Sequence, residues 1–519
     1  MQDIGYDASA VGGANGDIVF GKSYGVIFSN PAIMSRIRPH GGIGFTLYKP
    51  EMKVKLKMTA EERTAAGLDI PYAIFNAVDK AGAYSWETPN RPQPTVNLPH
   101  RARDTSISAP QTAITAGGLM DFGLPGFRLG GALVLPMIYQ ANLNTHYYDE
   151  READFSNQIH PARFGEWSPV VTGLVGASYC PHFFDYISLG LALQISITTK
   201  ADVDLYMADI TSDDYSNQNV GMKAGLKFRP IVGLQAEMPH PVDFWALGFT
   251  WRNESYIDVD GSGVMELRGY FEPNDDPQNM DNIPRVVEQK FKMALDYEPM
   301  EVAAGTGFRY KGWNSQIGVT WSRWSKFRDP HGETPQRAAV WQDKRATKYS
   351  DESSSYYGTY SFGDNNHFQW KDTVNVTANT SYNYLEEIGV NWVSMRLGFA
   401  YKPSPVPVQE GRTNYADTDT WCAAFGHRIE FDIKDRYRFW FDLGLQLWLL
   451  AARNTYKIVG HDADGNPLFY DEFPDTLVDK NTGESFVIAQ GLQTNNPGFP
   501  GYRLSGWMLV TSATVNLEF

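Results

Sequence analysis

The last thirteen residues of the chain, 507–519, alternate between two kinds of side chain. The even positions change from apolar to polar, and the odd positions stay largely apolar: Met508, Val510, Ser512, Thr514, Asn516 and Glu518 against Trp507, Leu509, Thr511, Ala513, Val515, Leu517 and Phe519. Successive side chains of a β-strand point to opposite faces. The segment therefore predicts a strand with one apolar face and one face that becomes polar toward the end.

Strand-like segments elsewhere are joined by short turns at one end and long polar stretches at the other. The short turns fall at residues 123–126, 181–185, 239–241 and 310–313, and the long stretches at 59–111, 329–366 and 460–502. Short turns on one side and long loops on the other are typical of outer-membrane β-barrels. A strand that ends on an aromatic residue agrees with the closing strand of such a barrel. The alternative is a half-buried strand of a soluble sandwich.

The composition is compatible with a barrel. The 519 residues carry a formal charge of −15, which argues against nucleic acid as a partner. No run of about 18 apolar residues is present, which excludes a conventional transmembrane helix. A barrel escapes this exclusion because polar residues alternate with its lipid-facing ones. The length of three average domains then becomes one large barrel.

The N-terminus and the cysteines set two further expectations. The first residues show neither a basic region nor an apolar region of a signal peptide, so either the protein is not exported or its signal peptide is absent from the sequence. Cys180 and Cys422 are 242 positions apart, and both a disulfide and two buried thiols are open, the thiols being favoured.

Two catalytic motifs near the N-terminus match by letters alone. Residues 16–23 fit the P-loop pattern and residues 21–25 fit G-x-S-x-G. Both motifs need a preceding strand and a following helix, and neither flank is predicted here. We therefore predict no enzyme, with no catalytic residue, no cofactor and no metal site.

Several segments, in order along the chain, resemble the FadL family of outer-membrane long-chain fatty-acid transporters together with its aromatic-hydrocarbon relatives such as TodX. An Asn-Pro-Ala motif at residues 30–32 stands directly before the first predicted strand. The other matching segments are 246–252 (ALGFTWR), 319–327 (VTWSRWSKF), 370–373 (WKDT) and 398–407 (GFAYKPSPVP), the last followed by Arg412-Thr413, Asp417 and Asp419. The resemblance covers essentially the whole chain.

The resemblance implies an all-β, antiparallel transmembrane barrel of about fourteen strands with an N-terminal plug, or hatch, inside its lumen. The plug would comprise residues 1–40 and the barrel residues 41–519. Two positions depart from the family. Residues 21–28 replace an Asp-Asp-Ala, and the third strand has Pro136-Met137 where the family has a proline, an aromatic residue and a glycine. The family opens its wall sideways at this proline, so the size of a lateral opening at Pro136 is in question.

The resemblance also assigns roles to single residues. Lys371 and Lys200 stand where the family places cations that meet a ligand head group, and Arg252 lies in a matching strand. For each of the three, a structural role is the alternative: a solvated lysine for the first two and an internal ion pair for Arg252. Asn30, Pro31 and Ala32 would form the gate of the plug.

The function implied is passive import of a hydrophobic small molecule, either a long-chain fatty acid or an aromatic hydrocarbon. The long loops would capture the ligand, an apolar pocket in the lumen would bind it, and a plug rearrangement would release it. The protein would be a monomer in the bacterial outer membrane, in contact with lipid and lipopolysaccharide. The alternatives are an adhesion or structural barrel and, less favoured, a lipid hydrolase.

Overall fold

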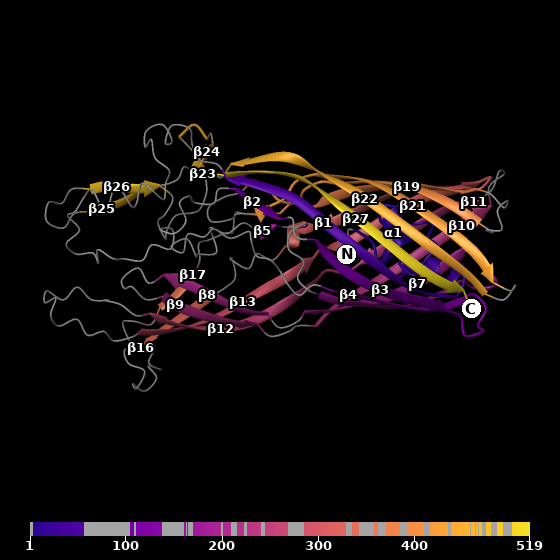
Figure 1. Ribbon diagram of the computed structural model, residues 1–519, viewed down its shortest axis with the longest axis horizontal. Coiled ribbons are helices and arrows are strands. Elements are labelled where there is room, and N and C mark those ends of the chain that lie inside the picture. The colour runs from indigo at the N-terminus through magenta and orange to yellow at the C-terminus, as the bar shows by residue number, and fades with distance from the viewer. Residues whose placement is uncertain are drawn as a thin grey trace.

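The computed structural model is shown in Figure 1. It describes residues 4–56, 104–107, 110–137, 160–161, 163, 170–198, 201–208, 215–222, 226–239, 244–267, 285–327, 335–341, 358–361, 370–384, 392–408, 415–433, 437–456, 458–461, 463–465, 467–469, 474–478, 485–490 and 501–518.

Fourteen antiparallel strands form a closed barrel, as predicted (Figure 1). They are β1 (His40–Leu56), β3 (Gln111–Met120), β4 (Phe127–Pro136), β6 (Val170–Tyr179), β7 (Ile187–Thr198), β10 (Leu226–Pro239), β11 (Phe244–Arg252), β14 (Met300–Tyr310), β15 (Trp313–Arg323), β18 (Thr373–Tyr384), β19 (Trp392–Lys402), β21 (Thr420–Ile433), β22 (Tyr437–Tyr456) and β27 (Gly501–Glu518). Each strand pairs with the next in this order, and β1 pairs with both β3 and β27. Closure leaves the wall without a free edge, as a lipid environment requires.

The last strand, β27, lies between β1 and β22 and places its two kinds of side chain as the alternation predicts. The even residues Met508, Ser512 and Asn516 are buried inside, whereas Trp507 and Val515 are exposed on the outer face. The inner face accommodates polar groups because other polar groups meet them there. Ser512, for example, is within 2.9 Å of the hydroxyl of Thr46 in β1.

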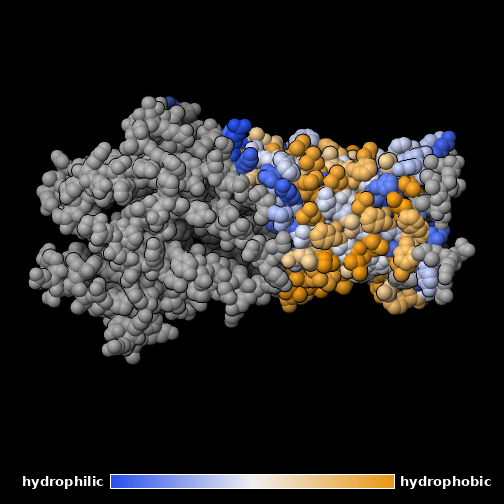
Figure 2. Space-filling model, viewed as in Figure 1, coloured by the Kyte–Doolittle hydropathy of each residue, from blue (hydrophilic) through white to orange (hydrophobic). Residues whose placement is uncertain are grey.

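An apolar belt surrounds the outer face of the barrel. Figure 2 shows it as an orange band, with blue residues at its borders. It consists of exposed large side chains from many strands, including Ile43, Leu133, Val175, Leu191, Phe249, Ile317, Leu397, Leu445 and Leu449. An apolar band on a closed barrel is the surface that a lipid bilayer covers.

One end of the barrel carries short turns and is called the turn end. Residues 121–126 join β3 to β4, residues 180–186 join β6 to β7, and Lys311-Gly312 joins β14 to β15. The last turn has positive φ at both residues, 44° and 83°, as a two-residue hairpin of matching twist requires. The predicted turn at 239–241 lies mostly outside the described residues.

The opposite, loop end extends into a second sheet of six strands (Figure 1). These are β8 (Ala201–Ala208), β9 (Tyr215–Met222), β12 (Ser255–Leu267), β13 (Arg285–Glu298), β16 (Pro335–Trp341) and β17 (Gly358–Ser361). The remaining elements are β2 (Asp104–Ile107), which pairs with β1, the pair β5 (His160–Pro161) and β20 (Tyr415–Ala416), the pair β23 (Ile458–His461) and β24 (Pro467–Phe469), the pair β25 (Pro474–Val478) and β26 (Ser485–Gln490), and the 3-10 helix η5 (Trp324–Lys326).

The strand-like run over residues 244–260 is interrupted: β11 ends at Arg252 and β12 begins at Ser255. Asn253 still lies opposite Pro230 of β10, and its N–H donates to the Pro230 carbonyl at 3.1 Å. Proline has no N–H to donate in return, and Nε of Arg229 donates to the Asn253 carbonyl at 2.7 Å instead. The regular β10–β11 ladder therefore ends at this point.

Three short helices precede β1: α1 (Ala8–Gly12), α2 (Val26–Ser29) and the 3-10 helix η1 (Pro31–Arg36). We call residues 4–39 the N-terminal segment. Within the described parts of the chain, no helix is long and apolar enough to cross a membrane.

Candidate functional site

The N-terminal segment lies inside the barrel. Nearly all of its residues are buried, although it contains only three short helices. α1 contacts β19, β21, β22 and β27, whereas η1 contacts β4, β6, β7 and β10 on the other side of the lumen. A buried segment with neighbours all around the barrel fills its cross-section, and its attachment to the wall is the candidate functional site.

The segment is held in shape by the carboxylate of Asp7. Its Oδ1 accepts from the backbone N–H of Ala10 at 2.8 Å and so caps α1. Its Oδ2 accepts from the Ser23 hydroxyl at 2.6 Å and from the Gly25 N–H at 2.7 Å, directly before α2. One buried carboxylate therefore joins the two halves of the segment.

The wall has glycines where the segment approaches it most closely. At five of them, a Cβ atom would overlap backbone atoms of the segment: Gly190 in β7, Gly233 in β10, Gly248 in β11, Gly398 in β19 and Gly444 in β22. At Gly190 the overlap is with the backbone of Pro31 and Ala32. The missing side chains thus leave the space in which residues 30–32 lie.

Asn30 of the predicted gate is fully buried, and both its amide nitrogen and its amide oxygen form hydrogen bonds. Its Nδ2 donates to the carbonyl of Ile18 at 2.8 Å and to that of Leu234 in β10 at 3.1 Å. Its Oδ1 accepts from the N–H of Ala32 at 3.1 Å, so Asn30 caps η1, and Pro31 occupies the first turn, where a proline costs no hydrogen bond. Asn30 therefore ties two parts of the segment to the wall.

Arg252 of β11 binds the same part of the segment. Its Nε donates to the carbonyl of Phe28 at 3.1 Å and its Nη2 to that of Ser29 at 2.9 Å, while Nη1 contacts Glu301 at 3.0 Å. The guanidinium also lies over the Phe28 ring, 4.5 Å from its centroid. The sequence leaves two interpretations of Arg252, a ligand-binding cation or the partner of an internal ion pair. The ion pair, with Glu301, is present.

Arg252 belongs to a larger buried group of charges on β10, β11 and β14 and at the end of β13. Lys227 pairs with Glu298 at 2.7 Å, and Arg229 contacts Glu298 at 3.4 Å and Glu301 at 3.2 Å. The two carboxylates are partly exposed, at 12% and 18%, whereas Lys227 and Arg229 are almost fully buried. Each charge is compensated by its neighbours, as burial requires.

Opposite this group, polar side chains of the wall hold the first half of the segment. Arg396 of β19 forms an ion pair with Asp17 and donates to the carbonyl of Ser9 at 2.9 Å. Gln316 of β15 accepts from the N–H of Val19 at 2.9 Å, and Gln446 of β22 donates to the carbonyl of Val11 at 2.8 Å. These bonds satisfy backbone groups that lack a regular ladder.

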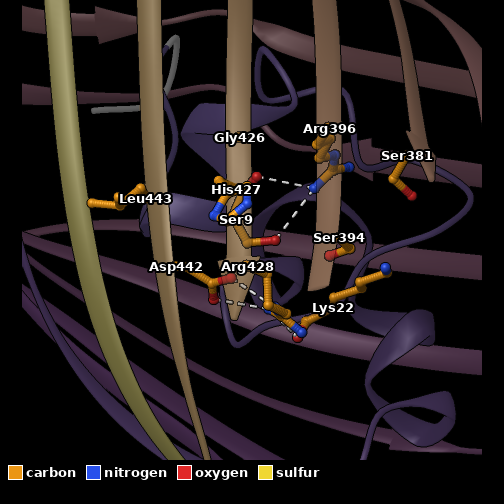
Figure 3. Close-up of a pocket in the computed structure, with 10 residues that line it drawn as sticks. All are labelled: Ser9, Lys22, Ser381, Ser394, Arg396, Gly426, His427, Arg428, Asp442 and Leu443. Atoms are coloured by element: carbon orange, nitrogen blue, oxygen red, sulfur yellow. Dashed lines mark hydrogen bonds and ion pairs between the residues drawn. The ribbon is translucent and has the colours of Figure 1, made fainter. Parts of the chain in front are cut away.

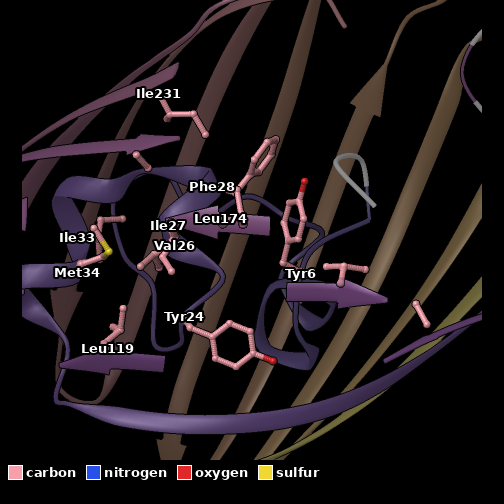
Figure 4. Close-up of a cluster of buried hydrophobic side chains, with 13 residues drawn as sticks. Tyr6, Tyr24, Val26, Ile27, Phe28, Ile33, Met34, Leu119, Leu174 and Ile231 are labelled. Atoms are coloured by element: carbon pink, nitrogen blue, oxygen red, sulfur yellow. The ribbon is translucent and has the colours of Figure 1, made fainter. Parts of the chain in front are cut away.

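An apolar cluster joins the second half of the segment, together with Tyr6, to the wall (Figure 4). From the segment come Tyr6, Tyr24, Val26, Ile27, Phe28, Ile33 and Met34, and from the wall Ala113, Leu119, Val134, Leu174, Ala192 and Ile231. The wall residues belong to β3, β4, β6, β7 and β10. This apolar part of the segment therefore faces the part of the barrel that includes the third strand of the wall, β4.

Pro136 is the last residue of β4. It pairs with Ala113 of β3, and the next N–H, that of Met137, donates to the carbonyl of Thr112 at 2.8 Å. On the other side of β4, the described ladder to β6 ends at Val134 and Thr172. β4 thus stays attached to β3 at Pro136 but has no paired β6 residue there within the described ranges.

Of the two other predicted cations, the structure describes only Lys371, which lies at the loop end of the barrel. Lys371 is exposed, two residues before β18, and its N–H donates to the carbonyl of Pro405 at 2.9 Å. Next to it is a buried aromatic cluster at the loop end of the barrel, in which Trp324 and Trp370 stack at 5.7 Å and Tyr415 packs on Trp370. Lys200 lies outside the described residues.

A polar pocket lies between the segment and the wall near the turn end (Figure 3). Ser9 and Lys22 of the segment line it, together with residues of four successive strands: Ser381, Ser394, Arg396, Gly426, His427, Arg428, Asp442 and Leu443. Arg428 forms two hydrogen bonds with Asp442, at 2.6 and 2.8 Å, and donates to the carbonyl of Lys22 at 3.2 Å.

Burial shifts the pKa of three groups of the segment. Burial and the guanidinium groups of Arg428 and Arg396 lower the pKa of Lys22 to about 7. Burial raises the pKa of Asp17, although Arg396 favours the carboxylate, and burial raises that of Tyr6.

Cys180 and Cys422 are both buried and free, which confirms the two buried thiols and not the disulfide. In the described part of the chain, no group of three or more His, Cys, Asp and Glu side chains is arranged to hold a metal ion.

Solved structures share this architecture. A FadL homologue of Pseudomonas aeruginosa matches with a TM-score of 0.54 at 13% identity, over 99% of this chain and 98% of that one. The CymD monoaromatic hydrocarbon channel matches with a TM-score of 0.51 at 11% identity, over 100% and 99%. The P. putida toluene transporter TodX matches with a TM-score of 0.51 at 10% identity, over 100% and 99%.

This chain has the FadL-like barrel fold. The finding confirms, at the level of fold, the resemblance drawn from the sequence. No family model and no curated protein matches the chain. A FadL-like barrel with an apolar belt supports a location in the bacterial outer membrane.

Sequence reasoning missed Gln316, Gln446 and Arg396, which hold the segment. It also missed Glu298 and Glu301, which pair with buried cations of the wall. A signal for one of them exists. Gln446 is a single amide among alternating leucines, at an inward position of the stretch LGLQLWLL. A lone polar residue at an inward position predicts a partner inside the barrel.

Proposed function

We propose that this protein is a passive channel for the import of hydrophobic small molecules across the outer membrane. The observation that carries the proposal is the N-terminal segment: it fills the lumen, yet many separate hydrogen bonds and only short helices hold it. Short helices held by separate hydrogen bonds can open locally without unfolding of the barrel. A segment of this kind therefore suits a gate better than a permanent plug. The FadL-like fold adds support, since the similar structures include a toluene transporter and a monoaromatic hydrocarbon channel.

In this proposal, residues 1–40 are the plug and residues 41–519 the barrel. Asn30, Pro31 and Ala32 form the gate, because Asn30 joins η1, Ile18 and β10. The loops capture the ligand from the lipopolysaccharide side, and Lys371 and Lys200 meet a polar head group, while Arg252 acts through the segment. The protein works as a monomeric channel for fatty acids or aromatic hydrocarbons, without catalysis.

We place the lateral exit between β4 and β6, beyond Pro136. Proline lacks an N–H, so it cannot donate to a neighbouring strand at this point of the wall. Two features support this site: the described β4–β6 ladder ends at Val134, and the apolar cluster of the segment reaches β4 through the same residue. A ligand moving along the apolar side of the segment would reach this part of the wall.

A reversible tether tests the gate. Ser29→Cys combined with Thr250→Cys, with Cys180 and Cys422 replaced by alanine, joins the segment to β11, because the Thr250 hydroxyl donates to the Ser29 carbonyl at 2.9 Å. Oxidation should abolish uptake of a radiolabelled hydrophobe into proteoliposomes, and reduction should restore it. The two single-cysteine variants are the controls, and heat-modifiable migration on gels checks assembly.

The proposal fails if the oxidised, tethered protein transports as fast as the reduced one. An additional variant, Asn30→Ala, should slow uptake while the barrel still assembles.

A further inference from the structure

The pocket near the turn end contains a buried donor without a partner. Nε of Arg396 is buried and has no hydrogen-bond partner within the described residues. The hydroxyls of Ser381 and Ser394 line the same pocket, and neither forms a hydrogen bond with another described residue. An unsatisfied buried donor is costly, so Nε of Arg396 indicates a missing partner in this pocket.

Lys22 adds a cation to the same pocket. Its Nζ donates to the amide oxygen of Asn383 at 3.1 Å, and within the described residues no carboxylate lies at ion-pair distance from it. The neighbouring carboxylates serve the arginines instead. Asp442 and Glu430 pair with Arg428, and Asp17 pairs with Arg396. Burial and the positive charges of Arg428 and Arg396 lower the pKa of Lys22, and an anion in the pocket would offset these charges.

The groups that line the pocket come from two parts of the molecule, the N-terminal segment and the wall. Lys22 and Ser9 belong to the N-terminal segment, whereas Ser381, Ser394 and Arg396 belong to β18 and β19. Figure 3 shows Ser381 on one strand and Ser394 and Arg396 on its neighbour, near Ser9 and Lys22 of the segment. A partner with several acceptor oxygens could accept hydrogen bonds from both sides at once, which one water molecule does less completely.

We propose that this pocket binds a small oxyanion, either a carboxylate or inorganic phosphate, and that the bound anion fastens the N-terminal segment to β18 and β19. The site is separate from the apolar cluster and from the buried charges around Arg252. It lies near the turn end, away from the loops that would capture a hydrophobe. The anion is therefore a regulator of the segment and not the transported molecule.

Equilibrium dialysis of the full-length protein in detergent tests the site directly, with radiolabelled formate and radiolabelled phosphate as separate probes at constant ionic strength. We expect one saturable site per chain for at least one probe. Lys22→Met and Ser394→Ala should each weaken binding at least tenfold. Lys311→Met is the matched control, because it removes an exposed lysine from the turn between β14 and β15.

Hydrogen exchange gives a second readout that a nonspecific salt effect does not produce. The bound probe should slow exchange of residues 8–24 in the natural protein and in Lys311→Met, but not in Lys22→Met. Binding of formate alone identifies a carboxylate site, and binding of phosphate alone identifies a phosphate site. Absence of saturable binding for both probes overturns the proposal, as does binding that Lys22→Met and Ser394→Ala leave unchanged.

Neither readout measures transport, so a negative result leaves the proposed import function standing. Heat-modifiable migration shows whether each variant has folded. Because Ser394→Ala removes one hydroxyl and leaves every described hydrogen bond intact, it tests the pocket even if Lys22→Met disturbs the segment.

Discussion

At the scale of single residues, the wall of this barrel is specified as much by missing side chains as by those present. Gly190 faces the backbone of residues 31 and 32 with no atom between, and four further glycines face the segment in the same way. Glycine is the residue that allows two backbones to approach so closely. These positions therefore determine where the segment lies.

Gly190→Ala should displace residues 30–32 from β7. The new methyl group would overlap backbone atoms, which cannot rotate away, and overpacking of this kind costs about 1 to 3 kcal/mol. We expect faster hydrogen exchange in η1 and a lower urea midpoint of unfolding. Gly131→Ala in β4 is the control, because its nearest neighbour would be the Leu174 carbonyl at an ordinary 3.7 Å. Equal effects of the two variants would contradict the close approach.

Lys22 should make the stability of the protein depend on pH. Its folded pKa of about 7 lies below its ordinary value of 10.5, so the unfolded state binds more protons between these values. The free energy of unfolding should therefore rise with pH across this window. Lys22→Met should remove this part of the rise, as measured by urea unfolding from pH 7 to pH 10. Identical pH profiles of the two proteins would show that Lys22 titrates normally.

At the scale of elements, the two halves of the segment have different attachments. α1 and residues 13–20 are held by Arg396, Gln316 and Gln446, whereas α2 and η1 are held by Arg252 and by the apolar cluster. The halves share the carboxylate of Asp7. One half can therefore loosen while the other stays bound to the wall.

Arg252→Leu should loosen α2 and η1 selectively. The change removes both hydrogen bonds to the carbonyls of Phe28 and Ser29, while Glu301 keeps its contact with Arg229. Removing one partner of a buried charged network costs about 3 kcal/mol. Exchange should accelerate in residues 26–36 more than in residues 4–20.

Arg252→Lys serves as the comparison, because it keeps the charge but lacks the fork that reaches both carbonyls. It should accelerate exchange in the same residues to a smaller extent. A uniform acceleration along the whole segment in Arg252→Leu would argue against separate attachment of the halves.

Sequence patterns predicted elements better than they predicted partners. The alternation in β27 and the short turns of residues 121–126 and 180–186 are local, and the structure confirms both. The local pattern does not predict the break between β11 and β12, because the break depends on Arg229 and Pro230 of the neighbouring strand. The contact between Arg252 and Glu301 was not specified either, since the pairing of β11 with β14 decides which carboxylate lies near.

At the scale of the whole molecule, the outer face of the barrel has side chains suited to lipid, and the inner face has side chains that contact the N-terminal segment. Leu443, Leu445, Leu447 and Leu449 of β22 are exposed on the belt, while Asp442, Gln446 and Trp448 between them are buried inside. Because successive side chains of a strand point to opposite faces, one strand presents an apolar face to the outside and a largely polar face to the lumen.

Leu191→Lys should destabilise the barrel in a bilayer. Leu191 is 63% exposed on the belt, and a lysine near the middle of a bilayer costs about 2 to 4 kcal/mol. Phe183→Lys is the control at the tip of a turn, where the side chain is 80% exposed and the cost should stay below about 1 kcal/mol. Urea unfolding from lipid vesicles measures both. Equal costs at the two positions would show that the belt does not contact lipid hydrocarbon.

The glycines beneath the segment have a consequence for the electrical behaviour of the membrane. Complete withdrawal of residues 4–39 would uncover bare backbone at Gly190 and Gly444, together with the polar groups of Arg396, Gln316 and Gln446. Such a ring would be wide and wet, and ions would cross it more readily than a hydrophobe. A route for an apolar molecule instead needs the apolar side of the segment to remain as one of its walls. In the proposed import function, uptake by a partial shift would therefore proceed without an ionic current through the barrel.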